Sequence, residues 1–158
     1  MAKITRAVAL NNVFGSAPYG NLSVLKFRMQ TNASGAVINS DSTAAVASGD
    51  VVDLGPLPAG MHLDDVMVTV STALTASVTG KLGFAYSDGV DDATVPQNDA
   101  YFFAATSLAA AAVIRKTATT APVVLPKEAR LILTTGGAAN AKASLTDIRV
   151  IGELAGQR

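Results

Sequence analysis

The sequence predicts an all-β protein, an antiparallel β-sandwich of about eight strands with the jelly roll as the favoured arrangement. Short segments alternate between apolar and polar residues with a period of two. Gly, Pro, Asn, Asp and Ser separate these segments, and no long amphipathic helical pattern interrupts them. Several short strands with turn residues between them are typical of sandwiches and barrels.

Three segments share a clear alternation of large apolar residues with polar or small ones; they are residues 22–29, 66–70 and 82–86. In the first segment, Leu25 and Phe27 alternate with Lys26 and Arg28. This pattern gives a strand one buried face and one solvated face. We therefore expect all three segments to pack one face against a shared core.

Further strand signals are weaker; in chain order they cover residues 4–10, 35–39, 51–54, 113–117, 123–125, 131–135 and 144–151. In the last of these, Leu145 has the opposite parity to Ile148, so we predict a β-bulge near Asp147. Residues 136–140 have the composition of a hairpin turn that would join the last two strands. Residues 106–112 are rich in Ala and fit either one or two helical turns or a strand or loop.

The length of 158 residues fits one domain, and we expect residues 1–158 to form a single β-sandwich. Residues 1–20 are expected to form an extended N-terminal arm. Residues 31–50, rich in Ser, Ala, Thr, Asn and Gly, are expected to leave the sheet as an edge excursion. The sequence shows neither an export signal nor an apolar run long enough for a membrane span, so we expect no membrane partner.

The charge balance excludes some classes of protein. Lys and Arg total 12 and Asp and Glu total 12, so the net charge of zero argues against a nucleic-acid-binding protein. The absence of Cys excludes disulfides and cysteine-based metal sites. By segment, residues 1–30 carry only basic groups, residues 31–100 are strongly acidic, and the remainder is basic again. This polarity either orients the molecule on a partner or is mixed in space by folding.

The sequence gives little support for catalysis. His62 is the only histidine, and the adjacent Asp64 and Asp65 are expected to point to opposite faces of a strand. Neither a nucleophile elbow nor a phosphate-binding glycine loop occurs. We therefore expect a protein that is not an enzyme and that uses no cofactor.

Two groups of residues have both a functional and a structural interpretation. The acidic loop at residues 87–92, with Asp99 beyond it, offers the oxygen ligands that calcium prefers. It lacks the spacing of an EF-hand, so a solvated loop is the favoured interpretation. Five aromatic residues either stack on sugars or bases or pack in the core, which we favour; they are Tyr19, Tyr86, Tyr101, Phe102 and Phe103.

Four stretches carry a resemblance to a known family; they are residues 53–60, 66–70, 82–86 and 100–104, with the acidic loop before the last. In this order they resemble the small jelly-roll structural proteins of tailed bacteriophages, in particular head decoration or cement proteins. The resemblance covers about residues 50–115. It implies a virion protein on the capsid exterior, usually a trimer, that binds major capsid proteins and stabilises their contacts. The small apolar and hydroxyl side chains also favour assembly.

The basic N-terminal part is our candidate capsid interface, because capsid exteriors are commonly acidic and opposite charge steers docking. The residues concerned are Lys3, Arg6, Lys26 and Arg28. Their alternative role is a solvated strand face. Two other functions stay open: a neck or tail component of a phage particle, and a carbohydrate-binding β-sandwich that uses Asp88, Asp91, Asp92 and nearby tyrosines.

Overall fold

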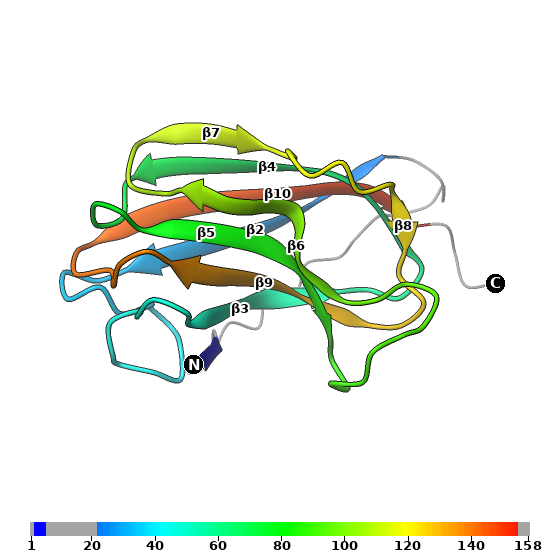
Figure 1. Ribbon diagram of the computed structural model, residues 1–158, viewed down its shortest axis with the longest axis horizontal. Coiled ribbons are helices and arrows are strands. Elements are labelled where there is room, and N and C mark those ends of the chain that lie inside the picture. The colour runs from blue at the N-terminus through cyan, green and yellow to red at the C-terminus, as the bar shows by residue number, and fades with distance from the viewer. Residues whose placement is uncertain (1, 6–21, 155–158) are drawn as a thin grey trace.

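The computed structural model describes residues 2–5 and 22–154, which form strands, turns and loops (Figure 1). The strands, in chain order, are β1 (Lys3–Thr5), β2 (Ser23–Thr31), β3 (Val51–Leu57), β4 (Met61–Thr72), β5 (Thr79–Tyr86), β6 (Asn98–Ser107), β7 (Ala112–Arg115), β8 (Val123–Val124), β9 (Ala129–Gly136) and β10 (Ser144–Leu154). Among these residues no helix is long and apolar enough to cross a membrane.

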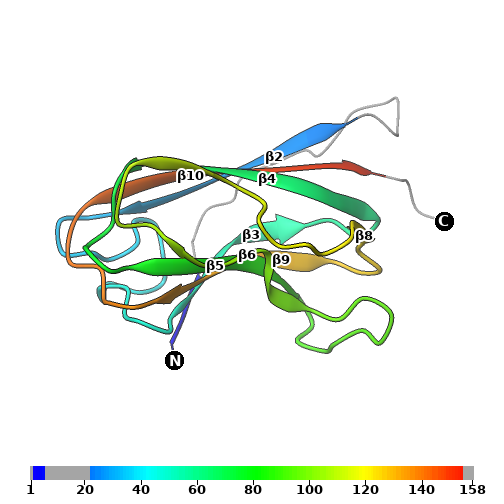
Figure 2. The same cartoon turned by 45° about the horizontal axis from the view of Figure 1, so that its top comes forward.

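The strands form two sheets that face each other as layers (Figures 1 and 2). The β9 sheet has the order β1-β3-β9-β5-β6, and the β10 sheet has the order β2-β10-β4-β7, with β8 also paired to β4. Only the short β1 pairs in parallel, with β3, while the other pairings are antiparallel. The predicted all-β antiparallel sandwich is confirmed.

The strand order is that of a jelly roll. Four antiparallel pairs nest within one another along the chain: β2 with β10, β3 with β9, β4 with β7, and β5 with β6. Successive pairs alternate between the two sheets, as they do when one long hairpin is rolled up. Eight strands make this roll, and β1 and β8 are short additions.

The core lies between the sheets and is filled by alternating residues of both. In β2 the predicted alternation is confirmed, with Leu25, Phe27 and Met29 buried and Lys26 and Arg28 exposed. The segments predicted at 66–70 and 82–86 lie inside β4 and β5. Six weaker candidates also coincide with strands, although residues 6–10 of the first lie outside the described residues.

The predicted bulge near Asp147 is wrong, because β10 alternates without interruption from Ser144 to Gly152. Leu145 lies half-buried on the outer face, and the inner face is continued by Thr146. The irregularity lies on the neighbouring β4, where Leu145 and Thr146 pair with Thr72 and Val70. Ser71 is therefore the extra residue.

Two local expectations are corrected, and one open alternative is decided. Residues 136–140 do not close a hairpin, because β9 and β10 belong to different sheets and the loop crosses between them. Gly137 makes this crossing possible, because its φ is 77° and a Cβ there would clash with the Ser77 carbonyl oxygen at 2.0 Å. Residues 35–39 form isolated bridges instead of a strand. Residues 106–112 run from the end of β6 to the start of β7, so the strand-or-loop interpretation of this segment holds and the helical one does not.

Residues 32–50 leave the sheet between β2 and β3. This excursion buries Val37 and Val46 in the core. Asn140 fixes it, because its backbone N–H donates to the Val46 carbonyl oxygen at 2.8 Å and its Nδ2 donates to Thr31 Oγ1 at 3.1 Å. The excursion is therefore an ordered part of the sandwich and not a linker.

Candidate interaction surface

The outer face of the β10 sheet carries basic side chains in register. One row across its four strands consists of Lys26, Arg149, Met67 and Arg115. In the adjacent row, Arg28 Nε donates to Asp147 Oδ1 at 2.7 Å, and this hydrogen bond raises the pKa of Arg28. The β-sheet register therefore gathers cations from β2, β7 and β10 on one exposed surface.

The four predicted interface residues do not form one surface. Lys26 and Arg28 lie together on β2. Lys3 lies on β1 at the edge of the β9 sheet, and Arg6 lies outside the described residues. Arg149 joins Lys26 through the pairing of β10 with β2, a neighbour that only the strand register reveals.

Lys3 takes part in a buried ionic contact around Asp53. The Asp53 side chain is 2% exposed, and Arg130 Nε lies 3.0 Å from each of its carboxylate oxygens. Lys3 Nζ lies 3.5 Å away on the other side. Since two cations compensate one buried carboxylate, this group stabilises the attachment of β1 and β9 to β3.

A second bulge corrects the expected placement of Asp64 and Asp65. On β4, Leu63 and Asp65 pair with Gly152 and Ile151, so Asp64 is an extra residue and both carboxylates stay outside the core. His62 Nδ1 lies 2.7 Å from Asp64 Oδ1, and Arg115 pairs with Asp65. The arrangement is a group of ion pairs at the sheet surface.

The acidic loop between β5 and β6 uses its carboxylates to hold its own backbone. Asp92 Oδ1 accepts hydrogen bonds from Thr94 and Val95, which lower the pKa of Asp92. Lys127 Nζ donates to Asp88 Oδ2 at 2.7 Å and lowers the pKa of Asp88. In the described part of the chain no group of three or more His, Cys, Asp or Glu side chains is placed to hold a metal ion.

The aromatic rings of the described residues are core residues. Six rings are between 0 and 3% exposed; they belong to Phe27, Phe84, Tyr86, Tyr101, Phe102 and Phe103. The last four were candidate stacking residues, and their burial removes them from that role, while Tyr19 lies outside the described residues. Tyr101 also donates to the Leu63 carbonyl oxygen at 2.9 Å, and burial raises the pKa of Tyr101 to about 12.

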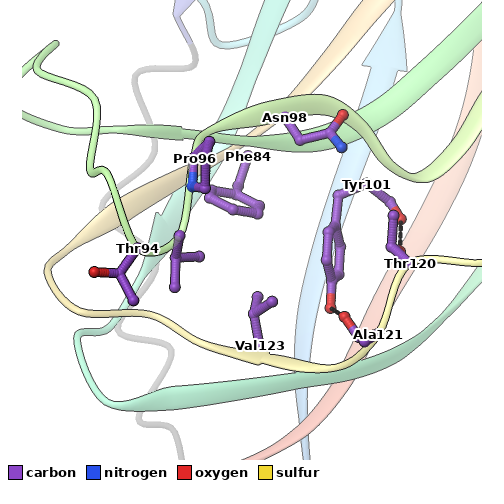
Figure 3. Close-up of a pocket in the computed structure, with 9 residues that line it drawn as sticks. Phe84, Thr94, Pro96, Asn98, Tyr101, Thr120, Ala121 and Val123 are labelled. Atoms are coloured by element: carbon purple, nitrogen blue, oxygen red, sulfur yellow. Dashed lines mark hydrogen bonds between the residues drawn. The ribbon is translucent and has the colours of Figure 1, made fainter.

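A small apolar pocket opens between the acidic loop and the segment that joins β7 to β8 (Figure 3). Its volume is about 250 Å³, and its walls include Val95, Pro96, Tyr101, Ala121 and Val123. Small-molecule sites usually occupy about 300–1,000 Å³. The pocket is therefore better matched to one protruding side chain than to a cofactor or sugar.

The fold is shared with chains from phage capsid structures. The chain has a TM-score of 0.65 and 17% identity to a chain from the capsid of Ralstonia phage GP4, over 99% of this chain and 100% of that one. For a chain from the cyanophage Pam1 capsid asymmetric unit, the TM-score is 0.60 and the identity 15%, over 89% of each. For a chain from the capsid of Helicobacter pylori bacteriophage KHP30, they are 0.50 and 14%, over 84% of this chain and 89% of that one.

No protein-family profile matches the sequence, and no curated protein matches it. Because all three identities are below 20%, the similarity to these capsid chains establishes a shared fold and nothing beyond it.

Proposed function

We propose that this protein is a structural virion protein of a tailed phage that decorates the exterior of the mature head and stabilises contacts between major capsid proteins. The observation that carries the proposal is the full-length match to a capsid chain, which spans 99% of this chain and all of the other. The counterpart is thus a jelly roll of similar extent found in a capsid. The role requires binding and no catalysis.

The proposed mechanism is multivalent bridging. Each copy buries a modest area, and many copies together add up to a large gain in shell stability. We propose that the protein acts as a homotrimer, because a closed ring of three matches threefold positions on a shell.

The capsid-facing surface in this proposal is the part of the outer face of the β10 sheet where β2 and β10 carry their basic side chains. Lys26 and Arg28 are exposed there and Arg149 lies beside Lys26 in the register. Opposite charge on the shell would accelerate encounter and fix orientation. Lys3 is not part of this surface, because β1 belongs to the other sheet.

The test uses purified protein added to heads that lack it, followed by sedimentation of the heads. We expect the wild type to sediment with the heads, and the double variant K26E/R28E to bind at least tenfold more weakly with an unchanged circular dichroism spectrum. The matched control is Lys142→Glu, which changes one exposed charge in the loop between β9 and β10. Failure of the wild type to bind any phage head would contradict the proposed function, and equal binding by the double variant would contradict the chosen surface.

The trimer is tested separately by light scattering after size exclusion. We expect a species of about 48 kDa, three times the chain mass of 16.0 kDa. A different stable mass would contradict the trimer and leave the binding experiment as the test of the decoration role.

A further inference from the structure

Asp50 immediately precedes β3 and has a buried carboxylate. The residue is 6% exposed. Its Oδ1 accepts a hydrogen bond from the Ala2 N–H at 3.0 Å, and its Oδ2 accepts one from the Ala47 N–H at 2.9 Å. In the part of the chain that the structure describes, no cation forms an ion pair with Asp50. Among these residues, its negative charge is therefore compensated by neutral donors.

Asp53 shows how the same strand compensates another buried carboxylate. Its side chain is 2% exposed, with Arg130 Nε at 3.0 Å and Lys3 Nζ at 3.5 Å from its oxygens. A buried charge is costly unless a cation or several hydrogen bonds compensate it. Asp53 therefore has the cations that Asp50 lacks among the described residues.

Both backbone groups of Ala2 are fixed beside Asp50. The Ala2 carbonyl oxygen accepts a hydrogen bond from the Val51 N–H at 3.1 Å, and the Ala2 nitrogen contacts Asp50 Oδ1. The parallel pairing of β1 with β3 begins one residue later, where Lys3 is the partner of Val51 (Figure 1). The Ala2 nitrogen is thus held where a positive charge would compensate the Asp50 carboxylate.

The backbone of Asp50 is fixed as well, so its carboxylate has a defined position. The Asp50 N–H donates to the Ala47 carbonyl oxygen at 3.2 Å. The Asp50 carbonyl oxygen accepts two hydrogen bonds from Thr135, one from the backbone N–H at 2.9 Å and one from Oγ1 at 3.1 Å. An acceptor that is already ordered binds a cation with little further loss of conformational entropy.

We propose that the peptide bond before Ala2 is cleaved and that the α-ammonium group so formed binds the Asp50 carboxylate. Hydrolysis adds one water across the bond between Met1 and Ala2. The segment that ends in Met1 leaves with the new carboxylate, and the Ala2 nitrogen becomes an amine that takes up a proton at neutral pH. Where Met1 alone is removed, an aminopeptidase specific for methionine before a small side chain suffices, and alanine is such a side chain. Asp50 binds the new group in the same way whatever length of chain is removed.

The cleavage replaces a neutral donor with a charged donor at the same place. A backbone N–H donates one hydrogen bond, whereas an ammonium group has three N–H donors and a positive charge. Charge-assisted hydrogen bonds are roughly twice as strong as neutral ones. Ala2 is exposed, so the donors that do not face Asp50 stay hydrated. Cleavage therefore strengthens the attachment of β1, whose Ile4 is buried in the core, and this effect does not depend on the proposed decoration role.

Mass spectrometry tests the cleavage. We expect the untagged protein, purified from bacteria, to lack Met1 in its intact mass and to begin with Ala2 on N-terminal sequencing. A purified protein that retains Met1 throughout would overturn the inference.

Hydrogen exchange of the Val51 amide tests the contact, because this N–H donates to the Ala2 carbonyl oxygen and reports the attachment of β1. The reference is the same chain with Met1 retained, produced while the methionine aminopeptidase is inhibited. We expect the Val51 amide to exchange at least fivefold more slowly in the cleaved chain than in the reference. Equal exchange rates in the two chains would overturn the inference.

Asp50→Asn tests whether the charge is responsible. Asparagine keeps an oxygen that accepts a hydrogen bond from Ala2 but carries no negative charge. We expect removal of Met1 to change the Val51 exchange rate less than twofold in this variant. The matched control is Asp147→Asn on β10, in the other sheet, where we expect the full fivefold effect. An effect of equal size in both variants would overturn the inference.

Acetylation of the α-amino group is a second test that leaves Asp50 unchanged, so it also serves if Asp50→Asn does not fold. The acetyl group removes the positive charge and restores an amide at the Ala2 nitrogen. We expect the Val51 amide of the acetylated chain to exchange as fast as that of the chain with Met1 retained. Exchange as slow as in the cleaved, unmodified chain would show that the charge has no effect and would overturn the inference.

Discussion

Asp53 is the residue whose charge matters most for the fold, because its carboxylate is buried and two cations depend on it. Replacement by Ala leaves Arg130, 28% exposed, without its partner. We expect Asp53→Ala to lower the free energy of unfolding by about 3 kcal/mol, since breaking a buried ion pair leaves an uncompensated charge. Urea unfolding followed by circular dichroism measures it.

The control for this prediction is Asp147→Ala, which breaks the contact between Asp147 and Arg28 on the outer face of the β10 sheet. The Arg28 side chain is 59% exposed, so solvent replaces the lost contact. The loss of stability should be clearly smaller than for Asp53→Ala. Equal losses of unfolding free energy in the two variants would mean that the buried position of Asp53 does not strengthen its contribution to stability.

Tyr101 makes the free energy of unfolding depend on pH above about pH 10. Burial of its ring raises the pKa to about 12 in the folded state, while the ordinary value is 10.0. The folded state therefore retains the phenolic proton more strongly than the unfolded state, so stability is constant below pH 10 and falls between pH 10 and 12. Ultraviolet titration of the phenols should show a late-ionising tyrosine in the wild type that the Tyr101→Phe variant lacks. Ionisation of every tyrosine near pH 10 would contradict this.

At the scale of the elements, the alternation of apolar and polar residues predicted most strands. The strand that it did not predict is one whose residues do not alternate. Strand β6 was not predicted because Tyr101, Phe102 and Phe103 are consecutive and all buried, which a period of two cannot produce. Leu82 of β5 pairs with Phe103 of β6, and Phe84 of β5 pairs with Asn98 of β6. The residues of β6 between Asn98 and Phe103 therefore form a bulge opposite Gly83. A bulge depends on the neighbouring strand, so the sequence of β6 alone does not reveal it.

The candidate interaction surface was also only partly predictable, because the sequence of one strand does not show which residues lie beside it. Lys26 and Arg28 were identified as basic residues of the N-terminal part and the alternation of their strand places them on one face, whereas Arg149 became their neighbour only through pairing with β10. Asp64 and Asp65 were assigned to opposite faces because a bulge on β4 was not foreseen. Properties within one strand were predictable, and properties between strands needed the register.

Gly83 tests the bulge of β6. A Cβ at this position would lie 1.9 Å from the carbonyl oxygen of Asn98, which is backbone and cannot rotate away. We expect Gly83→Ala to displace β6 and to cost about 1–3 kcal/mol or more of stability, as overpacking does. The measurement is thermal or urea unfolding, and a crystal structure would show the shift of residues 98–100.

The control is Gly89→Ala, in the acidic loop, where a Cβ would meet nothing within 4 Å. Its φ of 71° makes Gly89→Ala costly through the backbone alone, whereas Gly83 has no such φ, so the pair compares backbone strain with a steric clash. A larger loss of stability in Gly89→Ala than in Gly83→Ala would show that β6 shifts away from the added methyl group at little cost.

For the whole molecule, folding mixes the charges that the sequence separates. Cations of the two basic segments pair with carboxylates of the acidic one: Lys3 and Arg130 with Asp53, Arg115 with Asp65, and Lys127 with Asp88. The segment polarity is therefore largely neutralised within the fold. Lys26, Arg28 and Arg149 lie on the outer face of β2 and β10, so the proposed docking surface is a sheet face and not a chain terminus.

The jelly roll also interleaves the two halves of the chain, so neither half has a core of its own. The β10 sheet pairs β2 with β10, and the β9 sheet pairs β3 with β9, with residues such as Thr31 and Ser144 in direct contact. We expect one cooperative unfolding transition, with the same urea midpoint by far-ultraviolet circular dichroism and by tyrosine fluorescence. Tyr86 and Tyr101 report the β9 sheet, whereas circular dichroism reports both sheets. Two separate midpoints would show that one sheet can persist without the other, because the two signals would then follow different parts of the roll.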